Sequence, residues 1–187
     1  MEVSEAVPEY KSYTYADYCT WGDERWELVD GEAYAMAPGP SEAHQSVLLN
    51  LARKLSDYLE GKPCKVFVAP FDVRLNADTY DDTVVQPDIL VVCDEKKLDG
   101  KSCVGAPDLV VEILSPSTAT RDKTIKFKAY LQAGVREYWM ADPETKSISA
   151  HVLENGRYYT TIYFDNDTVP VHILEGCAIE LAKVFAE

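Results

Sequence analysis

The sequence contains few of the residues and motifs that mark the common classes of enzyme. Its three histidines, His44, His151 and His172, form no pair at helical spacing, and none of its five cysteines lies in a Cys-x-x-Cys arrangement. We therefore expect neither a zinc site nor a disulfide framework, and interpret the cysteines as reduced thiols of a cytoplasmic protein. A Gly-rich phosphate-binding loop and a nucleophile elbow are also absent from the sequence.

Long hydrophobic runs are absent as well. The longest uninterrupted apolar stretches are only a handful of residues, too short for a membrane span, and the acidic N-terminus lacks the apolar core of a signal peptide. Hydrophobic residues nevertheless make up 47% of the 187 residues, a globular composition. We expect one domain over residues 1–187, with residues 1–12 as a loose acidic arm.

Two short apolar runs, at residues 88–93 and 108–114, are typical of strands buried on both faces. A polar segment with Gly100 and Gly105 separates them. Antiparallel pairing across Gly100 sets Asp88 opposite Glu112, because the two residues are equally far from that glycine. Two neighbouring buried carboxylates need a compensating cation, and Mg²⁺ or Mn²⁺ suits oxygen ligands. The alternative for Asp88 is an ordinary strand-start carboxylate after Pro87.

Asp108 is a less suitable partner for Glu112. The two residues lie four positions apart on one strand, roughly 13 Å at about 3.3 Å per residue, which is too far for one metal ion to bridge. Asp88, on the neighbouring strand, is the better candidate.

A helix follows the second apolar run. Residues 116–120 have capping chemistry, Asp122 falls in the first turn, and Gly134 ends the helix after Ala133. Lys126 lies near the middle of the apolar arc of this helix. Its ammonium group either meets the carboxylate pair and, with substrate bound, a phosphate, or reaches water while its stem packs.

The rest of the pattern predicts a mixed sheet flanked by helices, an α/β or α+β fold. Asp30-Gly31 is a hairpin signal, and Ser41 begins a helix that runs to Glu60. The remaining expected elements are a short helix at 14–20 and strands near 26–36, 64–69, 71–75, 136–141, on both sides of 154–156, and at 169–174.

Several of these stretches together resemble the Uma-type restriction endonuclease family of the PD-(D/E)XK nuclease superfamily. They span nearly the whole chain: Trp26-Glu27-Leu28-Val29-Asp30-Gly31-Glu32, His44, Gln86-Pro87-Asp88, Pro107 to Thr118, Asp122, Lys126, Tyr130, and Gly134 to Trp139. The superfamily usually places a lysine two residues after the acid, where this chain has Leu114. The resemblance implies that Lys126 on the helix has taken over that role.

The resemblance also implies a restriction-endonuclease-like fold and a metal-dependent nuclease that acts on nucleic acid, in particular DNA. It implies that Glu27 joins the acidic cluster, that the carbonyl of Ile113 contacts the metal, and that His44 lies near the site. The residues alone favour the alternative that Glu27 is a surface charge at a strand end, just before the Asp30-Gly31 turn.

The charge balance argues against tight nucleic-acid binding, because 18 basic residues face 32 acidic ones. Seven basic residues within one third of the chain form either a local cationic rim or a solvated surface: Lys96, Lys97, Lys101, Arg121, Lys123, Lys126 and Lys128. A non-catalytic binding or assembly module of the same fold is therefore the alternative function.

We also expect a homodimer. Most oligomers are homodimers, and Tyr138, Trp139 and the twelve tyrosines suggest apolar surface that a second copy would cover.

Overall fold

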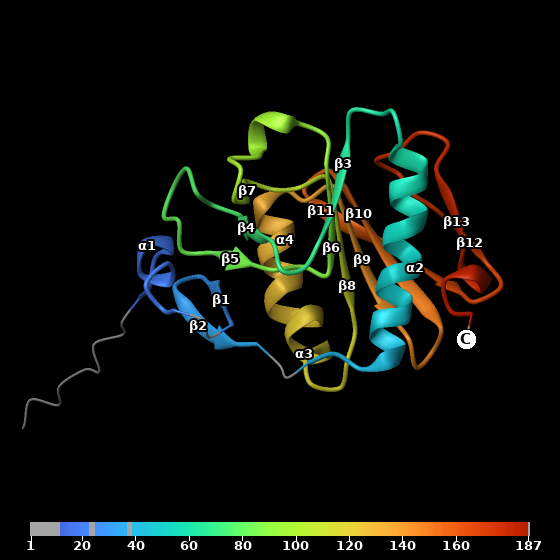
Figure 1. Cartoon of the computed structure of the whole chain (residues 1–187), viewed down its shortest axis with the longest axis horizontal. Helices are drawn as coiled ribbons and strands as arrows, with labels where there is room; N and C mark the ends of the chain where they lie inside the picture. The colour runs from blue at the N-terminus through green and yellow to red at the C-terminus, as the bar shows by residue number, and fades with distance from the viewer. Residues whose placement is uncertain (1–11, 23–24, 37–38, 187) are drawn as a thin grey trace, which may run out of the picture.

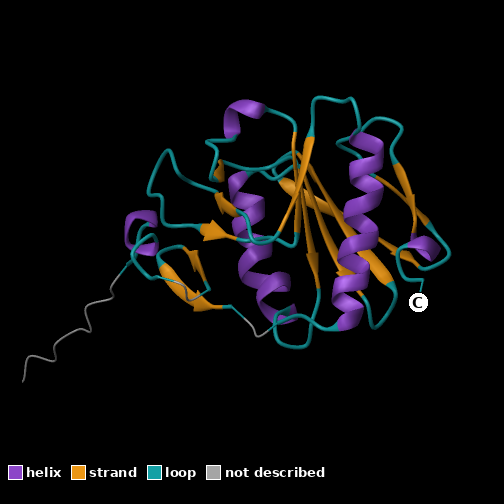
Figure 2. Ribbon diagram, viewed as in Figure 1, coloured by secondary structure: helices purple, strands orange, loops and turns teal. Residues whose placement is uncertain are grey.

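A six-stranded mixed sheet forms the centre of the protein (Figures 1 and 2). The computed structural model describes residues 12–22, 25–36 and 39–186, so the expected N-terminal arm falls almost wholly outside the described residues. Within this sheet, β8 and β9 pair in parallel and all other neighbouring strands pair antiparallel. The strand order is β11 (Arg157–Phe164), β10 (Ser147–Glu154), β9 (Glu137–Asp142), β8 (Leu109–Ile113), β6 (Ile89–Val92) and β3 (Lys65–Val68).

Helices cover both faces of this sheet, which confirms the predicted architecture (Figure 2). Helix α2 (Glu42–Leu59) packs on one face through Val47, Leu51 and Leu55, and helix α4 (Phe127–Ala133) packs on the other. Alternate residues of β8 join the two cores: Leu109, Val111 and Ile113 face α2, and Val110 and Leu114 face α4. Glu112 therefore points to the α4 side.

A second sheet of five short strands packs against the α4 side of the core. Its order is β2 (Glu32–Ala35), β1 (Trp26–Val29), β5 (Val84–Val85), β4 (Asp72–Arg74) and β7 (Ser102–Val104). The remaining elements are α1 (Tyr15–Tyr18), the 3₁₀ turns Glu95–Lys97 and Leu181–Lys183, and the strand pair β12 (Thr168–Pro170) and β13 (Ala178–Glu180).

The chain passes repeatedly between the two sheets through short connections. Residues 69–71 lead from β3 to β4, residues 86–88 lead from β5 to β6, and residues 105–108 lead from β7 to β8. Each connection contains one proline: Pro70, Pro87 and Pro107, respectively. The sequence predicted that β6 and β8 form a simple hairpin. This is wrong, because β7, which lies between them in the chain, belongs to the second sheet.

The helix after β8 has an unexpected turn at its centre. A short α-helical turn, α3 (Ala119–Arg121), leads into a π-helical turn at Asp122–Lys126 and then into α4, which ends as predicted at left-handed Gly134. Side chains on a π-helical turn point in different directions from those on a regular helix, and such turns are frequent at functional sites.

Two expectations about individual residues are wrong. Cys64 and Cys93 form a disulfide rather than staying reduced, because antiparallel pairing of β3 with β6 places them side by side at the strand ends. Tyr138 and Trp139 leave no apolar surface for a partner to cover, because both are fully buried in the central strand β9. Among the described residues, no helix is long and apolar enough to cross a membrane.

Truncating the α2 core contact should be costly. We expect Leu51→Ala to lower the free energy of unfolding by about 2–5 kcal/mol, because Leu51 is fully buried and its loss leaves a cavity. Leu49→Ala, on the solvent side of the same helix, should change it by less than about 0.5 kcal/mol. Urea denaturation of both variants measures the difference, and equal losses would contradict the assigned helix face.

A second prediction concerns His151, which is buried on β10 and packs against Phe127 and Tyr138. Burial lowers the pKa of His151 to about 4. The unfolded chain therefore binds a proton below its ordinary pKa of about 6.5 that the folded protein does not bind, so this contribution to stability is lost as the pH falls from about 6.5 to 4. We expect His151→Gln to reduce the acid-induced loss of unfolding free energy by about 2–3 kcal/mol. Denaturant titrations at several pH values test this, and parallel curves for variant and wild type would refute it.

Candidate active site

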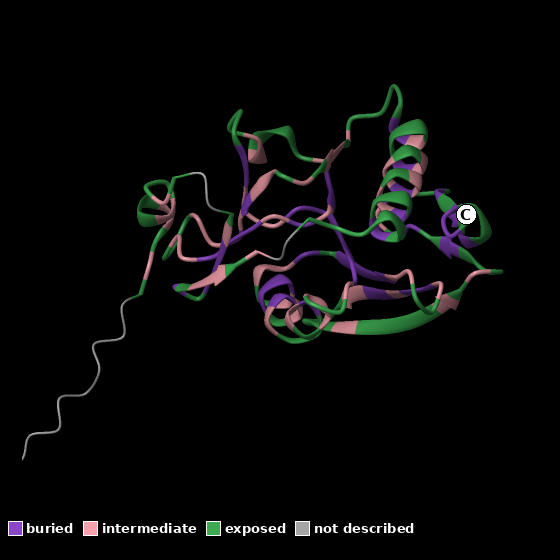
Figure 3. Cartoon of the chain, turned by 60° about the horizontal axis from the view of Figure 1, so that its bottom comes forward, coloured by how far each residue is buried: buried purple, intermediate pink, exposed green. Residues whose placement is uncertain are grey.

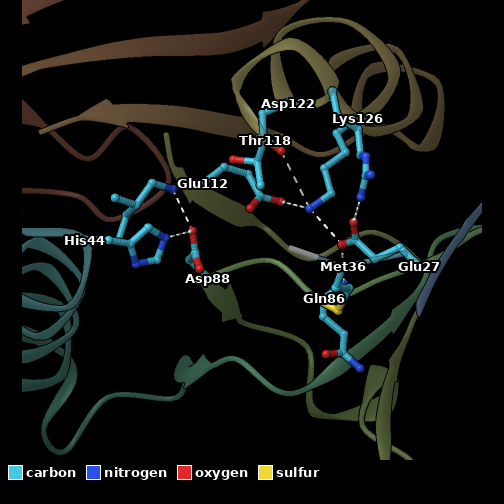
Figure 4. A pocket seen from close by; sticks show the side chains of 11 residues that line it. Glu27, Met36, His44, Gln86, Asp88, Glu112, Thr118, Asp122 and Lys126 are labelled. Carbon is cyan, nitrogen blue, oxygen red and sulfur yellow. Dashed lines mark hydrogen bonds and ion pairs between the residues drawn. The ribbon is translucent and has the colours of Figure 1, made fainter. Parts of the chain in front are cut away.

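Asp88 and Glu112 are brought to one end of the large sheet by the register of two strands. Ile89 pairs with Val111 across β6 and β8, so Asp88 and Glu112 occupy the next pair of positions, as the symmetry about Gly100 predicted. Both line a cavity of about 70 Å³, together with Glu27, Asp122 and Lys126 (Figure 4). This volume holds one or two waters or a partly hydrated ion, but not a nucleotide.

Lys126 lies inside the cavity with its ammonium group between carboxylates. Its Nζ is 2.7 Å from Glu112 Oε1, 2.7 Å from Glu27 Oε1 and 3.8 Å from Asp122 Oδ1. Its side chain is only 5% exposed, which excludes the alternative in which the head reaches water. The π-helical turn carries both Asp122 and Lys126, so it supplies one acid and the central cation.

Glu27 joins this cluster from the second sheet, so the surface alternative is wrong. Its carboxylate accepts hydrogen bonds from Lys126 and from the main-chain N–H of Gln86 at 3.0 Å, and it lies 3.5 Å from Arg121 Nη1. Strand β1 is half-buried at Trp26 and buried from Glu27 onward. Lys126 therefore connects β1 of one sheet to β8 of the other.

Asp88 is held at the opposite side of the cavity by two contacts to Oδ2 (Figure 4). The main-chain N–H of Ile113 donates to it at 2.7 Å, and His44 Nε2 lies 3.2 Å away. His44 Nδ1 is buried and has no hydrogen-bond partner in the described part of the chain. The sequence placed His44 near the site only by resemblance and did not identify its contact with Asp88.

Acidic groups outnumber cations around the cavity. Four carboxyl groups line it, against Lys126 and Arg121 as permanent cations and His44 as a titratable one. Burial raises the pKa of Glu112 well above its usual value, and Lys126 opposes this shift only in part. Burial likewise raises the pKa of Asp122. The site is therefore short of positive charge.

The acids also raise the pKa values of Lys126 and His44. Burial alone would lower the pKa of Lys126, but Glu112 and Glu27 more than offset it and hold the pKa above its usual value. Burial also acts to lower the pKa of His44, yet the bond to Asp88 leaves it raised. Tyr130 donates its hydroxyl proton to Glu112 Oε1 at 2.6 Å, so one oxygen of Glu112 already binds two donors.

The oxygen ligands present suit a hard divalent cation such as Mg²⁺ or Mn²⁺ better than a softer metal such as zinc. In the described residues, no three His, Cys, Asp or Glu side chains are grouped as a complete metal site. Glu112 Oε2 and Asp88 Oδ1 nevertheless have no hydrogen bond or ion pair there. Mg²⁺ is commonly held by one or two carboxylates and keeps several waters. Glu112 Oε2 and Asp88 Oδ1, in a cavity with more acidic than basic groups, fit this mode of Mg²⁺ binding.

The other acid that the sequence singled out lies elsewhere, as expected. Asp108 accepts a hydrogen bond from the main-chain N–H of Cys93 at 2.8 Å and pairs with Arg136 at 3.1 Å, outside the cavity. Of the two alternatives for the seven basic residues, a cationic rim at the cavity fits only a few of them. Lys96, Lys97 and Lys101 follow the far end of β6, so Arg121 is the basic residue at the cavity wall besides Lys126.

Comparisons with known proteins identify the family of this chain. A family model described as "Uma2: Putative restriction endonuclease" matches residues 13–182. Two uncharacterized proteins of Synechocystis sp. are similar in sequence: slr1290 is 31% identical over 118 residues, 61% of this chain and 60% of the relative. For sll1609, 32% identity over 125 residues covers 64% of this chain and 67% of the relative.

A solved structure shares the fold. The crystal structure of "a putative nuclease belonging to DUF820" from Anabaena variabilis superposes with a TM-score of 0.75 at 17% identity, covering 93% of this chain and 98% of that one. The expected restriction-endonuclease-like fold is thus confirmed. Because the family model matches residues 13–182, nearly the whole chain, this chain belongs to the Uma2 family.

Proposed function

We propose that this protein is an endonuclease that needs a divalent cation and hydrolyses phosphodiester bonds of DNA. The observation that carries the proposal is the buried ammonium group of Lys126, held between Glu27 and Glu112 beside Asp88. Burying one cation among four carboxyl groups costs stability that a purely structural core would avoid with apolar residues. Perturbed titratable groups that line one cavity are typical of a catalytic site.

Asp88, Glu112 and the main-chain carbonyl of Ile113 are the groups that would hold Mg²⁺ or Mn²⁺. When bound, the cation supplies Lewis-acid chemistry, which polarises the phosphate and lowers the pKa of a coordinated water. His44 and the N–H of Ile113 fix Asp88 through Oδ2, so its other oxygen is presented in one orientation. Tyr130 fixes Glu112 in the same way through Oε1.

Lys126 acts as a fixed positive charge rather than as a base. Because its neighbours hold the pKa of Lys126 above the usual value, it keeps its protons at neutral pH and donates hydrogen bonds. It orients the attacking water and stabilises negative charge on the phosphoryl oxygens as water attacks phosphorus in line with the leaving sugar oxygen. Glu27 positions Lys126, because its carboxylate accepts a hydrogen bond from the ammonium group on the side opposite Glu112.

Arg121 is placed to meet the DNA backbone at the wall of the cavity. Its guanidinium group donates to the carbonyl of Ala35 at 3.2 Å and lies over the ring of Tyr34, so its direction is set before substrate binds. The side chain is 23% exposed, unlike that of Lys126. The net charge of −14, in which Arg121 is already counted, opposes DNA binding, so the proposal relies on local cations such as Arg121 for contact with the backbone.

Cleavage assays separate catalysis from folding. We expect wild-type protein to nick supercoiled DNA with Mg²⁺ or Mn²⁺, and Lys126→Met to lose activity by about 10²–10³-fold or more, because a fixed charge at the transition state is removed. Lys128→Met, an exposed lysine on the same helix, is the matched control and should retain activity. Full activity in Lys126→Met would show that the buried lysine is only structural.

Parallel assays on single-stranded DNA and RNA test the proposed substrate, and absence of cleavage on all of them favours a non-catalytic binding module.

Metal binding gives a second, independent measurement. We expect Mn²⁺ to bind the wild-type protein in calorimetry and to raise its melting temperature, whereas Glu112→Gln should lose both effects because an amide is a poor ligand for a hard cation. Lys126→Met should bind Mn²⁺ at least as tightly, since a neighbouring positive charge has gone. Glu95→Gln, an exposed acid far from the cavity, should behave as wild type. If Glu112→Gln bound Mn²⁺ as tightly as the wild type, the metal would have to bind at a different site.

A further inference from the structure

The large sheet ends in a long strand whose outer edge pairs with no other strand in the described part of the chain. Strand β11 spans eight residues, from Arg157 to Phe164, and occupies the edge of the sheet. Six large apolar side chains are exposed in the described residues, and three of them, Tyr159, Ile162 and Phe164, lie on this strand at 52–56% exposure. In Figure 3, β11 is the long, mostly green strand at the lower edge.

Proteins usually protect such an edge with charges, proline or a bulge, because its free N–H and C=O groups can pair with another strand. Residues 158–164, Tyr-Tyr-Thr-Thr-Ile-Tyr-Phe, contain no charge and no proline. The register with β10 is continuous from Glu154–Arg157 to Ser147–Phe164, so no bulge interrupts the strand. The usual protections are therefore missing from residue 158 to residue 164.

The hydrogen-bond pattern shows which backbone groups of β11 point outward. The N–H of Leu153 donates to the carbonyl of Arg136, just before β9, so the backbone N–H and C=O groups of odd-numbered residues of β10 point to β9 and those of even-numbered residues point to β11. These even-numbered residues pair with odd-numbered residues of β11, so the N–H and C=O groups of the even-numbered residues of β11 point away from the sheet. Phe164 already pairs with Asp167, through its N–H to the side chain and its C=O to the N–H, each at 2.8 Å. The unpaired stretch is thus Tyr158, Thr160 and Ile162, centred on Thr160.

We infer that β11 is the interface of a symmetric homodimer, in which two copies pair antiparallel about Thr160 and form one continuous sheet. This register sets Thr160 opposite Thr160 and Tyr158 opposite Ile162 of the other copy, so all the outward N–H and C=O groups of the stretch find partners. Tyr158 and Ile162 share the α4 side of the sheet, because both are even-numbered residues. Aromatic and β-branched residues directly opposite each other stabilise a sheet.

Charge complementarity favours a second copy over an unrelated strand. In this register Arg157 lies opposite Tyr163 of the other copy, next to the turn that begins at Asp165, and the two-fold axis brings these opposite charges near each other twice. The uncharged stretch between these ends lets two molecules of net charge −14 approach without like charges at the contact. None of the residues that line the candidate active site lies on β10 or β11, so pairing leaves both cavities uncovered.

Analytical ultracentrifugation tests the interface directly. We expect a dimer at about 50 µM wild-type protein. Ile162→Lys, which places an edge-protecting charge in the pairing stretch, should weaken it by at least about tenfold, since the symmetric interface contains the substitution twice. Leu49→Lys is the matched control, because Leu49 is 66% exposed on α2, and it should leave the dimer intact. A monomeric wild type, or a dimer that Ile162→Lys does not weaken, would overturn the inference.

Cross-linking tests the register. Directly opposed hydrogen-bonded residues in an antiparallel pair have Cα atoms about 5.5 Å apart, within the range for a disulfide. In a Cys19→Ser background, which removes the exposed free thiol, Thr160→Cys should oxidise to a covalent dimer, and Leu49→Cys should not. Melting temperatures check that each variant is folded. Equal cross-linking of the two variants would contradict the assigned pairing.

Discussion

The attraction between one buried ammonium group and the carboxylates around it joins the two sheets of this protein. Lys126 leaves the π-helical turn and meets Glu27 from the second sheet and Glu112 from the first. Removing either partner leaves a buried charge uncompensated, which is far more costly than never having buried it. The position of β1 relative to β8, and therefore the shape of the cavity, depends on this contact.

The same contact explains why the cavity has excess negative charge. Lys126 and Arg121 together cannot neutralise Glu27, Glu112 and Asp122, and Asp88 is paired with a histidine rather than with a permanent cation. The raised pKa of Glu112 and of Asp122 reflects this imbalance as well as burial. A folded protein can keep such an arrangement where function compensates for the lost stability.

The sequence predicted the parts of the site that depend on local periodicity. The apolar runs at residues 88–93 and 108–114, paired about Gly100, predicted the register that places Asp88 beside Glu112, and the apolar arc of the helix predicted that Lys126 points inward. It could not place Glu27 or His44 by periodicity, because these residues reach the cavity from elements distant in the sequence. The exchange of β7 into the second sheet and the Cys64–Cys93 pair were missed for the same reason, because each depends on tertiary pairing, and the π-helical turn was missed because the apolar pattern does not distinguish it from a regular helix.

The short proline-containing connections between the sheets have a consequence for how a substrate enters. Hinge motion needs a few residues that can absorb large changes in backbone dihedrals, and proline fixes φ. Pro70, Pro87 and Pro107 each lie in a link of only three or four residues between sheets, and Pro87 directly precedes Asp88. The two sheets should therefore move as one rigid unit, without the jaw-like closing of two lobes. A polymer bound here would have to bend toward a fixed pocket, so the deformability of the polymer, more than any motion of the protein, would govern which stretches reach it.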